Sequence, residues 1–410
     1  ETILDKIPAP AINADAPFQL LVLALAQDSY KGKMGIGKIQ SGSIARRQNV
    51  VTLTKDGGQV PGKISDLAVF SGLERTDVET AEAGEIVALS GLEEVNIGDT
   101  IADPTNPVAL PRVTIDEPTV QMTFSVNNSP FAGRDGKYLT SRHLRERLFK
   151  ELETNVSLRV QETDSADRFL VAGRGELHLG VLIEQMRREG YELQISQPEV
   201  ILHREGDTVT EPFEELTIQV PSEYQGPVIE EIGKRRGELR HMKLVHSEGT
   251  ASEMHIEYHI PTRGIIGLKN ILLAKTRGTI ILHHVFSGYA PADEKALLVA
   301  PHGSLVAFEA GTSTAYALFM TQERGELFIG ASVEVYQGMV VGQNSRDEDL
   351  DVNVCKQKQL SNMRAAGTDE ALVLTPPREM SLEFAMEYIG QDELVEVTPK
   401  YLRLRKRLLN

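Results

Sequence analysis

Several clusters of basic side chains stand out along an acidic chain. The 410 residues contain 43 Lys and Arg against 59 Asp and Glu, which gives a formal net charge of −16. Cations grouped on such a background are the residue type that neutralises phosphate groups of a nucleic acid. We therefore consider three clusters as a candidate RNA-binding set, which comprises Lys356, Lys358, Asn362 and Arg364; Lys234, Arg235 and Arg236; and Arg403, Arg405, Lys406 and Arg407.

The spacing within two of these clusters suggests how each would meet RNA. Arg403, Arg405 and Arg407 alternate along the chain, and alternate residues of a strand share one face, so they would form a row suited to phosphates. The Lys356 cluster lies in a polar segment, 347–370, whose Asn and Ser side chains could bond base edges or 2′-hydroxyls. The alternative for each cluster alone is an ordinary solvated surface. The net negative charge also argues against non-specific nucleic-acid binding by the whole surface.

Other chemistries find little support in the residue pattern. Several histidines lie in close pairs, but a zinc site needs at least a third ligand. His255 and His259, on a predicted strand, would lie roughly 13 Å apart, too far to share one metal ion. The single cysteine, Cys355, excludes an internal disulfide and fits a reducing compartment. No nucleophile elbow is present, so we assign no catalytic residue, no metal site and no bound cofactor to this chain.

Length and composition describe a globular chain of several domains. Apolar residues make up 41% and charged residues 25% of the sequence, and 410 residues predict two to four domains. No run of eighteen apolar residues is present, so we expect no membrane-spanning helix. The chain begins at Glu1 without Met or a signal-peptide pattern, so we expect it to be part of a longer protein.

The order of predicted elements divides the chain into a β-rich and an α+β part. Short β-rich runs without a long helix predict a closed barrel over 18–113. Two successive β-α-β-β-α-β patterns predict two ferredoxin-like domains over 114–198 and 199–288. Residues 1–17 have linker composition, and residues 289–410 predict a β-rich domain. In that last domain we expect strands at 304–309, 315–319, 327–329 and 394–398, and a helix at 381–389.

The segment from Gly173 to Gly180, with the sequence Gly-Arg-Gly-Glu-Leu-His-Leu-Gly, predicts a joint between a strand and a helix. Its glycines permit backbone angles that other residues avoid. Glu176 favours the start of the helix through the helix dipole. Leu179, Leu182, Ile183 and Met186 fall on one helical face, so we interpret the segment as structural rather than as a binding site.

These motifs resemble those of the BipA/TypA family of translational GTPases, over essentially the whole chain. Segments 35–42 and 83–89 resemble the second domain of elongation factors, and segments 126–133 and 173–179 resemble the third domain of elongation factor G. The C-terminal residues make the resemblance specific to this one family of translation factors. Segments 361–370 (Ser-Asn-Met-Arg-Ala-Ala-Gly-Thr-Asp-Glu) and 392–399 (Asp-Glu-Leu-Val-Glu-Val-Thr-Pro) resemble the C-terminal domain specific to this family.

The resemblance implies that the family's GTPase domain lies outside this chain. Neither a G-x-x-x-x-G-K-[S/T] phosphate loop nor an Asn-Lys-x-Asp guanine motif occurs in the 410 residues, and residues 1–10 resemble the last turns of that domain. The chain itself is therefore expected to be non-enzymatic. The full-length parent would be a GTP hydrolase that holds GTP and Mg²⁺ in the absent domain.

The resemblance further implies a ribosome-binding role. The family's C-terminal domain reaches into the ribosomal A site, so the chain is expected to dock in the intersubunit cleft and contact 23S rRNA, A-site tRNA and ribosomal proteins. The implied process is large-subunit assembly and translation under stress or cold. We expect a monomer without membrane association, in the bacterial cytoplasm or, alternatively, the plastid stroma. A rival interpretation is a non-catalytic scaffold whose acidic surface binds a basic ribosomal protein.

Overall fold

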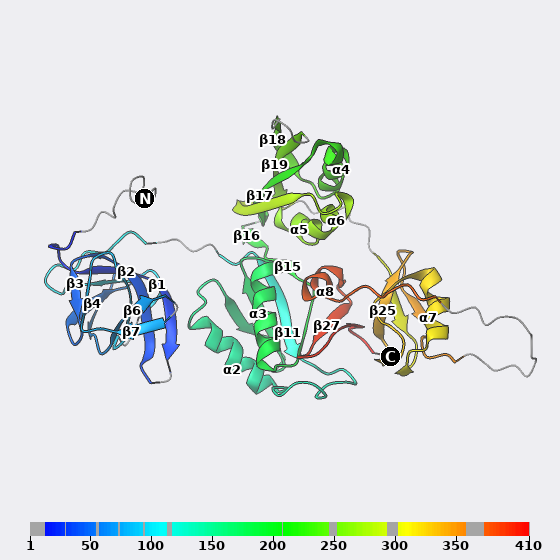
Figure 1. Ribbon diagram of the computed structural model, residues 1–410, viewed down its shortest axis with the longest axis horizontal. Coiled ribbons are helices and arrows are strands. Elements are labelled where there is room, and N and C mark those ends of the chain that lie inside the picture. The colour runs from blue at the N-terminus through cyan, green and yellow to red at the C-terminus, as the bar shows by residue number, and fades with distance from the viewer. Residues whose placement is uncertain are drawn as a thin grey trace, which may run out of the picture. The chain divides into compact units, whose positions relative to one another are not determined.

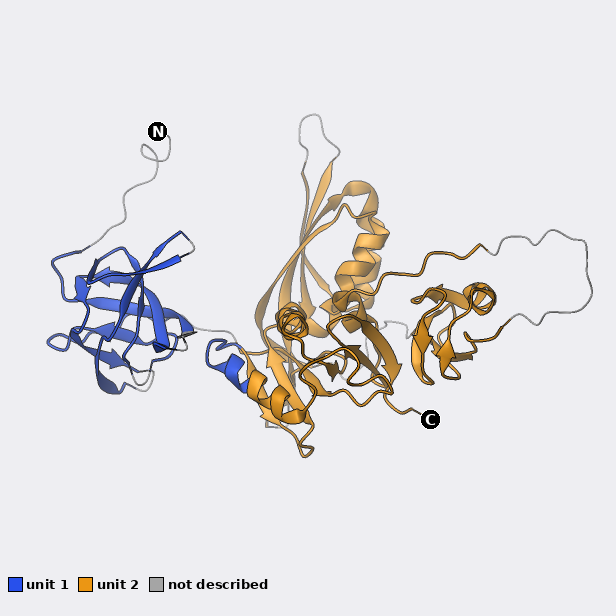
Figure 2. Ribbon diagram, turned by 60° about the horizontal axis from the view of Figure 1, so that its bottom comes forward, with its two compact units in different colours: residues 1–116, 149–157 blue, residues 117–148, 158–410 orange. Residues whose placement is uncertain are grey.

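The computed structural model describes residues 13–409, apart from 29, 55–56, 73, 93–94, 113–116, 207, 246–251, 293–301 and 358–372. The chain forms two compact units, which Figure 2 distinguishes by colour. Unit 1 comprises residues 1–116 and 149–157, and unit 2 comprises residues 117–148 and 158–410. Within the described residues, no helix is long and apolar enough to cross a bilayer.

Unit 1 is built on an antiparallel sheet that curls around one apolar core, at the blue end of the ribbon in Figure 1. The eight strands of this sheet follow the order β5-β4-β10-β1-β2-β9-β6-β7, and β3 pairs with β8 separately. Leu20, Ile39 and Val87, all fully buried, belong to the core. The strands are β1 Gln19–Asp28, β2 Gly32–Ser41, β3 Ser43–Ala45, β4 Asn49–Leu53, β5 Gln59–Lys63, β6 Leu67–Ser71, β7 Glu74–Asp77, β8 Thr80–Glu82, β9 Ile86–Leu89 and β10 Thr100–Ala102.

The first α+β domain of unit 2 has the predicted ferredoxin-like order. Its strands run β12-β13-β11-β14 across the sheet, so the first and third strands lie in the centre. Helix α3 packs its buried Leu179, Leu182, Ile183 and Met186 inward, as their spacing predicted. The elements are β11 Val120–Val126, α2 Ser141–Leu152, β12 Arg159–Glu162, β13 Arg168–Gly173, α3 Glu176–Glu189, β14 Leu193–Ile195 and β15 Glu199–Val200.

The second α+β domain repeats the same plan with β20-β17-β19-β18 across its sheet. Residues of α4, α5 and α6 share one apolar core with one face of this sheet. Helix α4 ends at Lys234, and Arg236 just beyond it adopts a left-handed φ of 63° where the chain turns into β18. The elements are β16 His203–Glu205, β17 Thr208–Pro221, η1 Ser222–Tyr224, α4 Gln225–Lys234, β18 Glu238–Val245, β19 Glu253–Pro261, α5 Thr262–Ile265, α6 Leu268–Lys275 and β20 Ile281–Pro291.

The C-terminal segment is continuous with the sheet of the first α+β domain. Strand β27 pairs antiparallel with β14, so that Gln194 lies opposite Glu396, and β28 connects onward to β25. One sheet of eleven strands therefore runs through both parts of unit 2. The elements are β21 Ser304–Ala307, β22 Gly311–Thr312, α7 Ala315–Thr321, η2 Gln322–Arg324, β23 Gly325–Leu327, β24 Glu334–Val335, β25 Met339–Asn344, β26 Leu350–Val352, α8 Leu382–Tyr388, β27 Glu393–Val397 and β28 Leu402–Lys406.

One predicted strand of this segment is wrong. Residues 315–319 lie in helix α7, because the Thr314 side chain accepts a hydrogen bond from the Ala317 N–H and caps the first turn. Strand β25 was not predicted, although Val340 and Val341 are buried at its centre.

The glycine joint before α3 has a steric rather than a torsional basis. Gly175 is fully extended, with a φ of 172° that any residue adopts. At Gly173 an added Cβ would lie 2.8 Å from Nδ1 of His178 and 3.0 Å from the Leu179 side chain. Gly190 ends the helix in the left-handed conformation at a φ of 99°. Gly173 and Gly190 therefore fix where α3 begins and ends.

Candidate nucleic-acid interface

Of the predicted cluster around the long polar segment, only Lys356 belongs to the described residues. Lys358, Asn362 and Arg364 lie outside them, within 358–372. The Lys356 side chain is exposed, and its carbonyl oxygen accepts a 2.6 Å hydrogen bond from the Thr314 hydroxyl. Thr314 also caps α7, so the backbone of Lys356 is anchored to the start of that helix.

The cluster at the end of α4 contributes mainly to the protein interior. Arg235 is 2% exposed, pairs with Glu231 at 3.3 Å, and donates hydrogen bonds to the carbonyl oxygens of Gly264 and Ile266. Lys234 forms an ion pair with Glu230 at 2.7 Å on the surface. Arg236 is half-buried at the turn into β18. Arg235 therefore stabilises the junction of α4 with α5, and the expectation of an RNA contact is wrong for its side chain.

Two of the C-terminal arginines, Arg403 and Arg405, are also engaged within the protein. Arg405 is 2% exposed and donates hydrogen bonds to the side-chain oxygens of Asn128 and Gln194. Arg403 lies between two carboxylates, 3.5 Å from Asp135 and 3.7 Å from Glu396. The expected row of phosphate-facing charges is therefore wrong for these two residues. Acidic and amide groups supplied by distant segments of the chain contact both guanidinium groups instead.

Lys406 and Arg407 differ in their exposure. The Lys406 ammonium group contacts Asp349 at 2.5 Å, Asp392 at 2.9 Å and Glu393 at 3.0 Å, and only 15% of its side chain is exposed. Burial opposes its charge, but the hydrogen bonds to Asp349 and Asp392 outweigh that effect and raise the pKa of Lys406. Arg407 is exposed, so within the C-terminal cluster its side chain is the most accessible to an outside phosphate.

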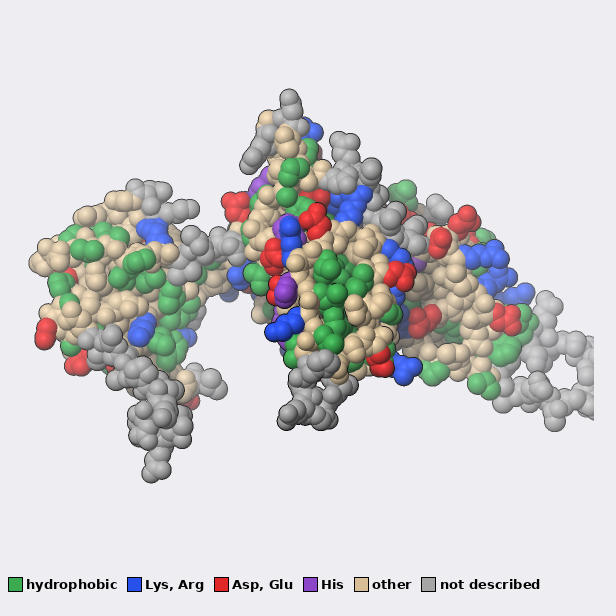
Figure 3. Space-filling view, turned by 90° about the horizontal axis from the view of Figure 1, so that it is seen from above, with side chains coloured by type: hydrophobic (Ala, Val, Ile, Leu, Met, Phe, Trp, Pro, Cys, Tyr) green, Lys and Arg blue, Asp and Glu red, His purple; other side chains and the backbone are tan. Residues whose placement is uncertain are grey.

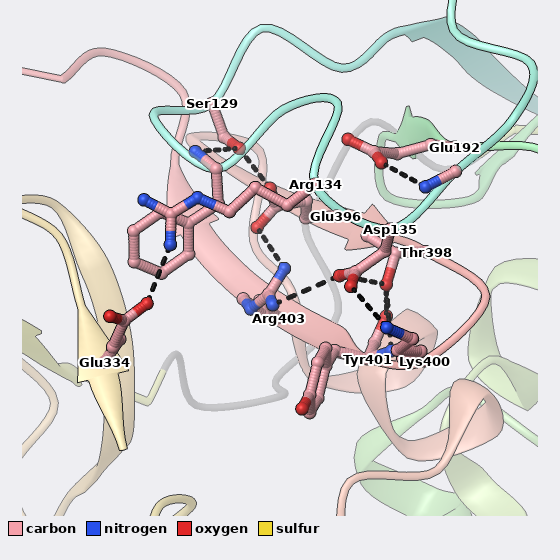
Figure 4. A network of polar contacts seen from close by, with 12 residues as sticks. Ser129, Arg134, Asp135, Glu192, Glu334, Glu396, Thr398, Lys400, Tyr401 and Arg403 are labelled. Atoms are coloured by element: carbon pink, nitrogen blue, oxygen red, sulfur yellow. Dashed lines mark hydrogen bonds and ion pairs between the residues drawn. The ribbon is translucent and has the colours of Figure 1, made fainter. Parts of the chain in front are cut away.

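A loop that carried no predicted function lies at the centre of the same polar network (Figure 4). It connects β11 to α2 and is tied down by two buried glutamates, one beside β14 and one on β27. Glu192 accepts hydrogen bonds from the backbone N–H groups of Gly133 at 2.8 Å and Gly136 at 3.0 Å. Glu396, which is fully buried, accepts hydrogen bonds from the Asn127 amide at 2.9 Å and from the Ser129 hydroxyl. These bonds satisfy two buried charges and fix the loop to the C-terminal strand.

Two exposed cations contact this loop, Arg134 from the loop itself and Lys400 from the turn between β27 and β28. Arg134 lies 3.9 Å above the ring of Phe131 and pairs with Glu334 at 2.7 Å, and Lys400 lies 3.6 Å from Asp135 (Figure 4). Half of the Arg134 side chain and about two thirds of the Lys400 side chain remain exposed, at 50% and 68%. The sequence signal for this loop was the recognisable run 126–133, to which no role was assigned.

Two further exposed arginines, also missed from the sequence, lie near the end of α7. The N–H of Ser345 donates to the carbonyl oxygen of Arg324 at 2.9 Å, which brings the backbone of Arg324 beside that of Arg346. Both side chains are exposed. Figure 3 shows Lys and Arg side chains gathered over this C-terminal part of unit 2. Among the described residues, the accessible cations of the C-terminal part are therefore isolated or lie in pairs, and they do not form one row.

A second polar cluster, in which Glu214 is buried and Glu176 and Glu387 are half-buried, lies where α3, β17, β20 and α8 approach one another. His284 on β20 forms a hydrogen bond with Glu214 on β17, which, with the charge of Glu214, raises the pKa of His284 against the effect of burial. Burial and the nearby Glu387 raise the pKa of Glu176 to about 7. One oxygen of Glu176 is buried without a hydrogen-bond partner among the described residues. The expected stabilisation of the helix start by a charged Glu176 is therefore reduced at neutral pH.

No metal centre arises from these carboxylates. Among the residues that the structure describes, no three His, Cys, Asp or Glu side chains lie together so that they could hold a metal ion.

Comparison with known families matches three parts of the chain. Residues 17–103 match elongation factor G domain 2, residues 208–298 match the elongation factor G C-terminus, and residues 302–410 match the TypA/BipA C-terminal domain. The first match covers the sheet of unit 1, the second covers the second ferredoxin-like domain, and the third covers the segment that completes the eleven-stranded sheet.

Curated relatives align along the whole chain. The large ribosomal subunit assembly factor BipA of Synechocystis sp. is 47% identical over 406 residues, which is 99% of this chain and 67% of that protein. The protein of the same name from Salmonella typhimurium is 46% identical over 409 residues, which is 100% of this chain and 67% of the relative. That from Haemophilus influenzae is 47% identical over 409 residues and 66% of its own length. Together with the match to the TypA/BipA C-terminal domain, these identities show that the chain belongs to the BipA (TypA) family of translation factors.

Proposed function

We propose that this chain is the ribosome-docking part of a BipA-like translational GTPase that acts in assembly of the large ribosomal subunit. The observation that carries the proposal is the identity of 46–47% with large-subunit assembly factors along all of its domains, including the family-specific tail. GTP and Mg²⁺ would be bound by a GTPase domain outside these 410 residues. The docking would take place in the cytoplasm, at the A site, and would involve 23S rRNA and tRNA.

The contacts would come from the C-terminal part of unit 2. Lys356 is exposed and anchored through its backbone to the cap of α7, and it leads directly into Lys358, Asn362 and Arg364. Because β27 pairs with β14, the C-terminal part and the first ferredoxin-like domain share one sheet, which supports the described residues up to Lys356. Arg407 adds a further exposed cation. The proposed contacts leave out Arg235, Arg403, Arg405 and Lys406, since each is engaged by groups of the protein itself.

Co-sedimentation with purified large ribosomal subunits tests the proposal. In the variant Lys356→Ala/Lys358→Ala/Arg364→Ala we expect weaker binding, and the slope of log K against log salt should fall by about three, roughly one per lost phosphate contact. A matched control removes three exposed cations elsewhere, as Lys150→Ala/Arg168→Ala/Lys269→Ala, and should retain most of the binding.

A second arm replaces residues 358–372 by a Gly-Ser segment of equal length. This exchange leaves strand β26, with its buried Val352, intact, so the fold should be preserved. Equal binding by the triple variant and the control would contradict the phosphate role. Binding that survives with RNA-free ribosomal proteins would instead favour the scaffold interpretation.

A further inference from the structure

The outer edge of the second ferredoxin-like domain combines an open strand with an exposed apolar row. Strand β18 is the last strand of its sheet and, among the described residues, has a strand partner on one side only. Leu239, Met242 and Leu244 of this strand are 50%, 42% and 43% exposed. An edge strand offers unpaired N–H and C=O groups that can accept an additional strand.

The three apolar residues continue the core face of the sheet beyond the helices. Met242 lies opposite the buried Ile256, and Leu244 lies opposite the buried Met254. On the helix side, Nε2 of Gln225 lies 3.3 Å from the sulfur of Met242, and Ile229, one turn further along α4, is 37% exposed. The apolar row on β18 therefore lies beside Gln225 and the exposed Ile229 of α4. Seen from above, a continuous strip of hydrophobic side chains lies over this region (Figure 3).

The opposite face of the same strand carries His241 and Lys243, and Glu257 of β19 lies opposite His241. From Leu239 to Val245, β18 carries Arg240, His241 and Lys243 and no carboxylate. His241 and Lys243 point away from the apolar row, because their partners on β19 are Glu257 and His255 rather than core residues. Arg240 is exposed and pairs with Glu238 at 3.4 Å. A strand added to this edge would thus meet apolar groups on one face and cations on the other.

We propose that β18 and α4 form a docking site for an extended protein segment with alternating apolar and acidic residues, which adds to the sheet as a further strand. Its apolar side chains would cover Leu239, Met242 and Leu244, and its carboxylates would lie beside His241 and Lys243. This site differs in position and chemistry from the RNA contacts proposed for the C-terminal part, because an apolar row contributes little to binding phosphate.

Protection against strand pairing and self-association both fit the β18 edge less well. A lysine on an edge strand is a common device against unwanted pairing, but three exposed apolar residues on the same strand work against that purpose. Pairing of β18 with a second copy of itself would place Arg240 and Lys243 of both chains on one face, and like charges across a strand pair are destabilising.

The experiment measures binding of labelled nine-residue peptides to the full chain by fluorescence anisotropy. The probes are a peptide of alternating valine and glutamate, its counterpart with lysine in place of glutamate, and the acidic peptide with alternate backbone nitrogens methylated. We expect the acidic peptide to bind at least tenfold more tightly than the basic one. The methylated peptide should lose binding, because it cannot donate all the hydrogen bonds of a strand.

Variants of the chain locate the site. Met242→Asp should weaken binding of the acidic peptide at least tenfold, and Lys243→Glu should reverse the preference towards the basic peptide. Val285→Asp, at a 68% exposed position on β20, is the matched control and should leave binding unchanged. Circular dichroism checks that each variant is folded. If Met242→Asp does not fold, Lys243→Glu alone is sufficient to test the site.

Three results would overturn the proposal. They are equal affinity for the acidic and basic peptides, no binding of either peptide, and binding that Lys243→Glu does not alter. Displacement of the acidic peptide by a single-stranded RNA nonamer, with the same dependence on residue 242, would also overturn it by pointing to a nucleic-acid surface. None of these outcomes depends on binding to ribosomes, so the two proposals fail separately.

Discussion

Arg405 on β28 donates a 2.8 Å hydrogen bond to Oε1 of Gln194 on β14, although 211 residues separate the two in the chain. Its guanidinium also bonds Asn128 in the loop after β11. Burial lowers the pKa of Arg405, while the nearby Tyr336 and Glu396 favour the charged form. A single cation from the C-terminal hairpin thus joins three segments of unit 2.

Removing this side chain should destabilise unit 2. In Arg405→Ala, Gln194 and Asn128 lose their donor, and a cavity replaces the largest fully buried side chain among the described residues. We expect the free energy of unfolding of unit 2 to fall by about 3 kcal/mol. Arg407→Ala, two residues away and exposed, should change it by less than about 0.5 kcal/mol. Thermal and urea unfolding measure the stability of both variants. Equal losses of stability in the two variants would contradict a stabilising role for the buried Arg405 side chain.

The stability of unit 2 should depend on pH through Glu176. Its pKa is about 7 in the folded protein, against an ordinary value of 4.5. The folded state therefore holds a proton that the unfolded chain releases, so stability is greatest below about 4.5 and decreases as the pH rises to 7. His284, whose pKa is also raised, contributes stability that is likewise lost as the pH rises through its folded value.

Glu176→Gln should remove the larger part of this dependence. Glutamine resembles the protonated carboxyl, so the variant should equal the parent in stability near pH 4 and exceed it at pH 8. Urea unfolding at both pH values checks this expectation. Glu379→Gln, at an exposed position, is the control and should show the parent's pH profile. A gain in stability that is the same at pH 4 and pH 8 would rule out titration of Glu176 as the cause.

The two glycines before α3 should respond differently to alanine. At Gly173 a Cβ would lie 2.8 Å from His178 and 3.0 Å from Leu179, so Gly173→Ala should cost about 1–3 kcal/mol. At Gly175 a Cβ would meet nothing within 4 Å and the backbone is extended, so Gly175→Ala should be neutral or stabilise slightly. Chemical unfolding compares the pair. A greater loss from Gly175→Ala would show that its φ, and not contact at Gly173, determines the joint.

The local pattern of the sequence was sufficient for most elements of unit 2. The positions of Leu179, Leu182 and Met186 predicted the buried face of α3, and the β-α-β-β-α-β order predicted both ferredoxin-like domains. It was insufficient at 315–319, where a seven-residue helix depends on one capping threonine. Short apolar runs do not distinguish strand from helix by periodicity alone.

The candidate site was less predictable, because its chemistry depends on pairing between distant segments. The alternation of Arg403 and Arg405 predicted correctly that they share a strand, but no local pattern predicts that Asp135, Glu396 and Gln194 surround them. Only the strand pairing of β14 with β27 brings those groups together. Exposure of a charged residue is thus a tertiary property, whereas strand and helix periodicity is a local one.

The pairing of β14 with β27 also bears on the order in which the protein matures during its own synthesis. The edge formed by Leu193, Gln194 and Ile195 acquires its neighbour only when Val395, Glu396 and Val397 have left the exit tunnel. Nascent chains that stop earlier would display that edge to other polypeptides and would lack Glu396, the anchor of the loop after β11. The eleven-stranded sheet is therefore complete only after the last strands have been synthesised. Premature termination near the C-terminus should thus be as damaging to the fold of unit 2 as a core mutation near β14.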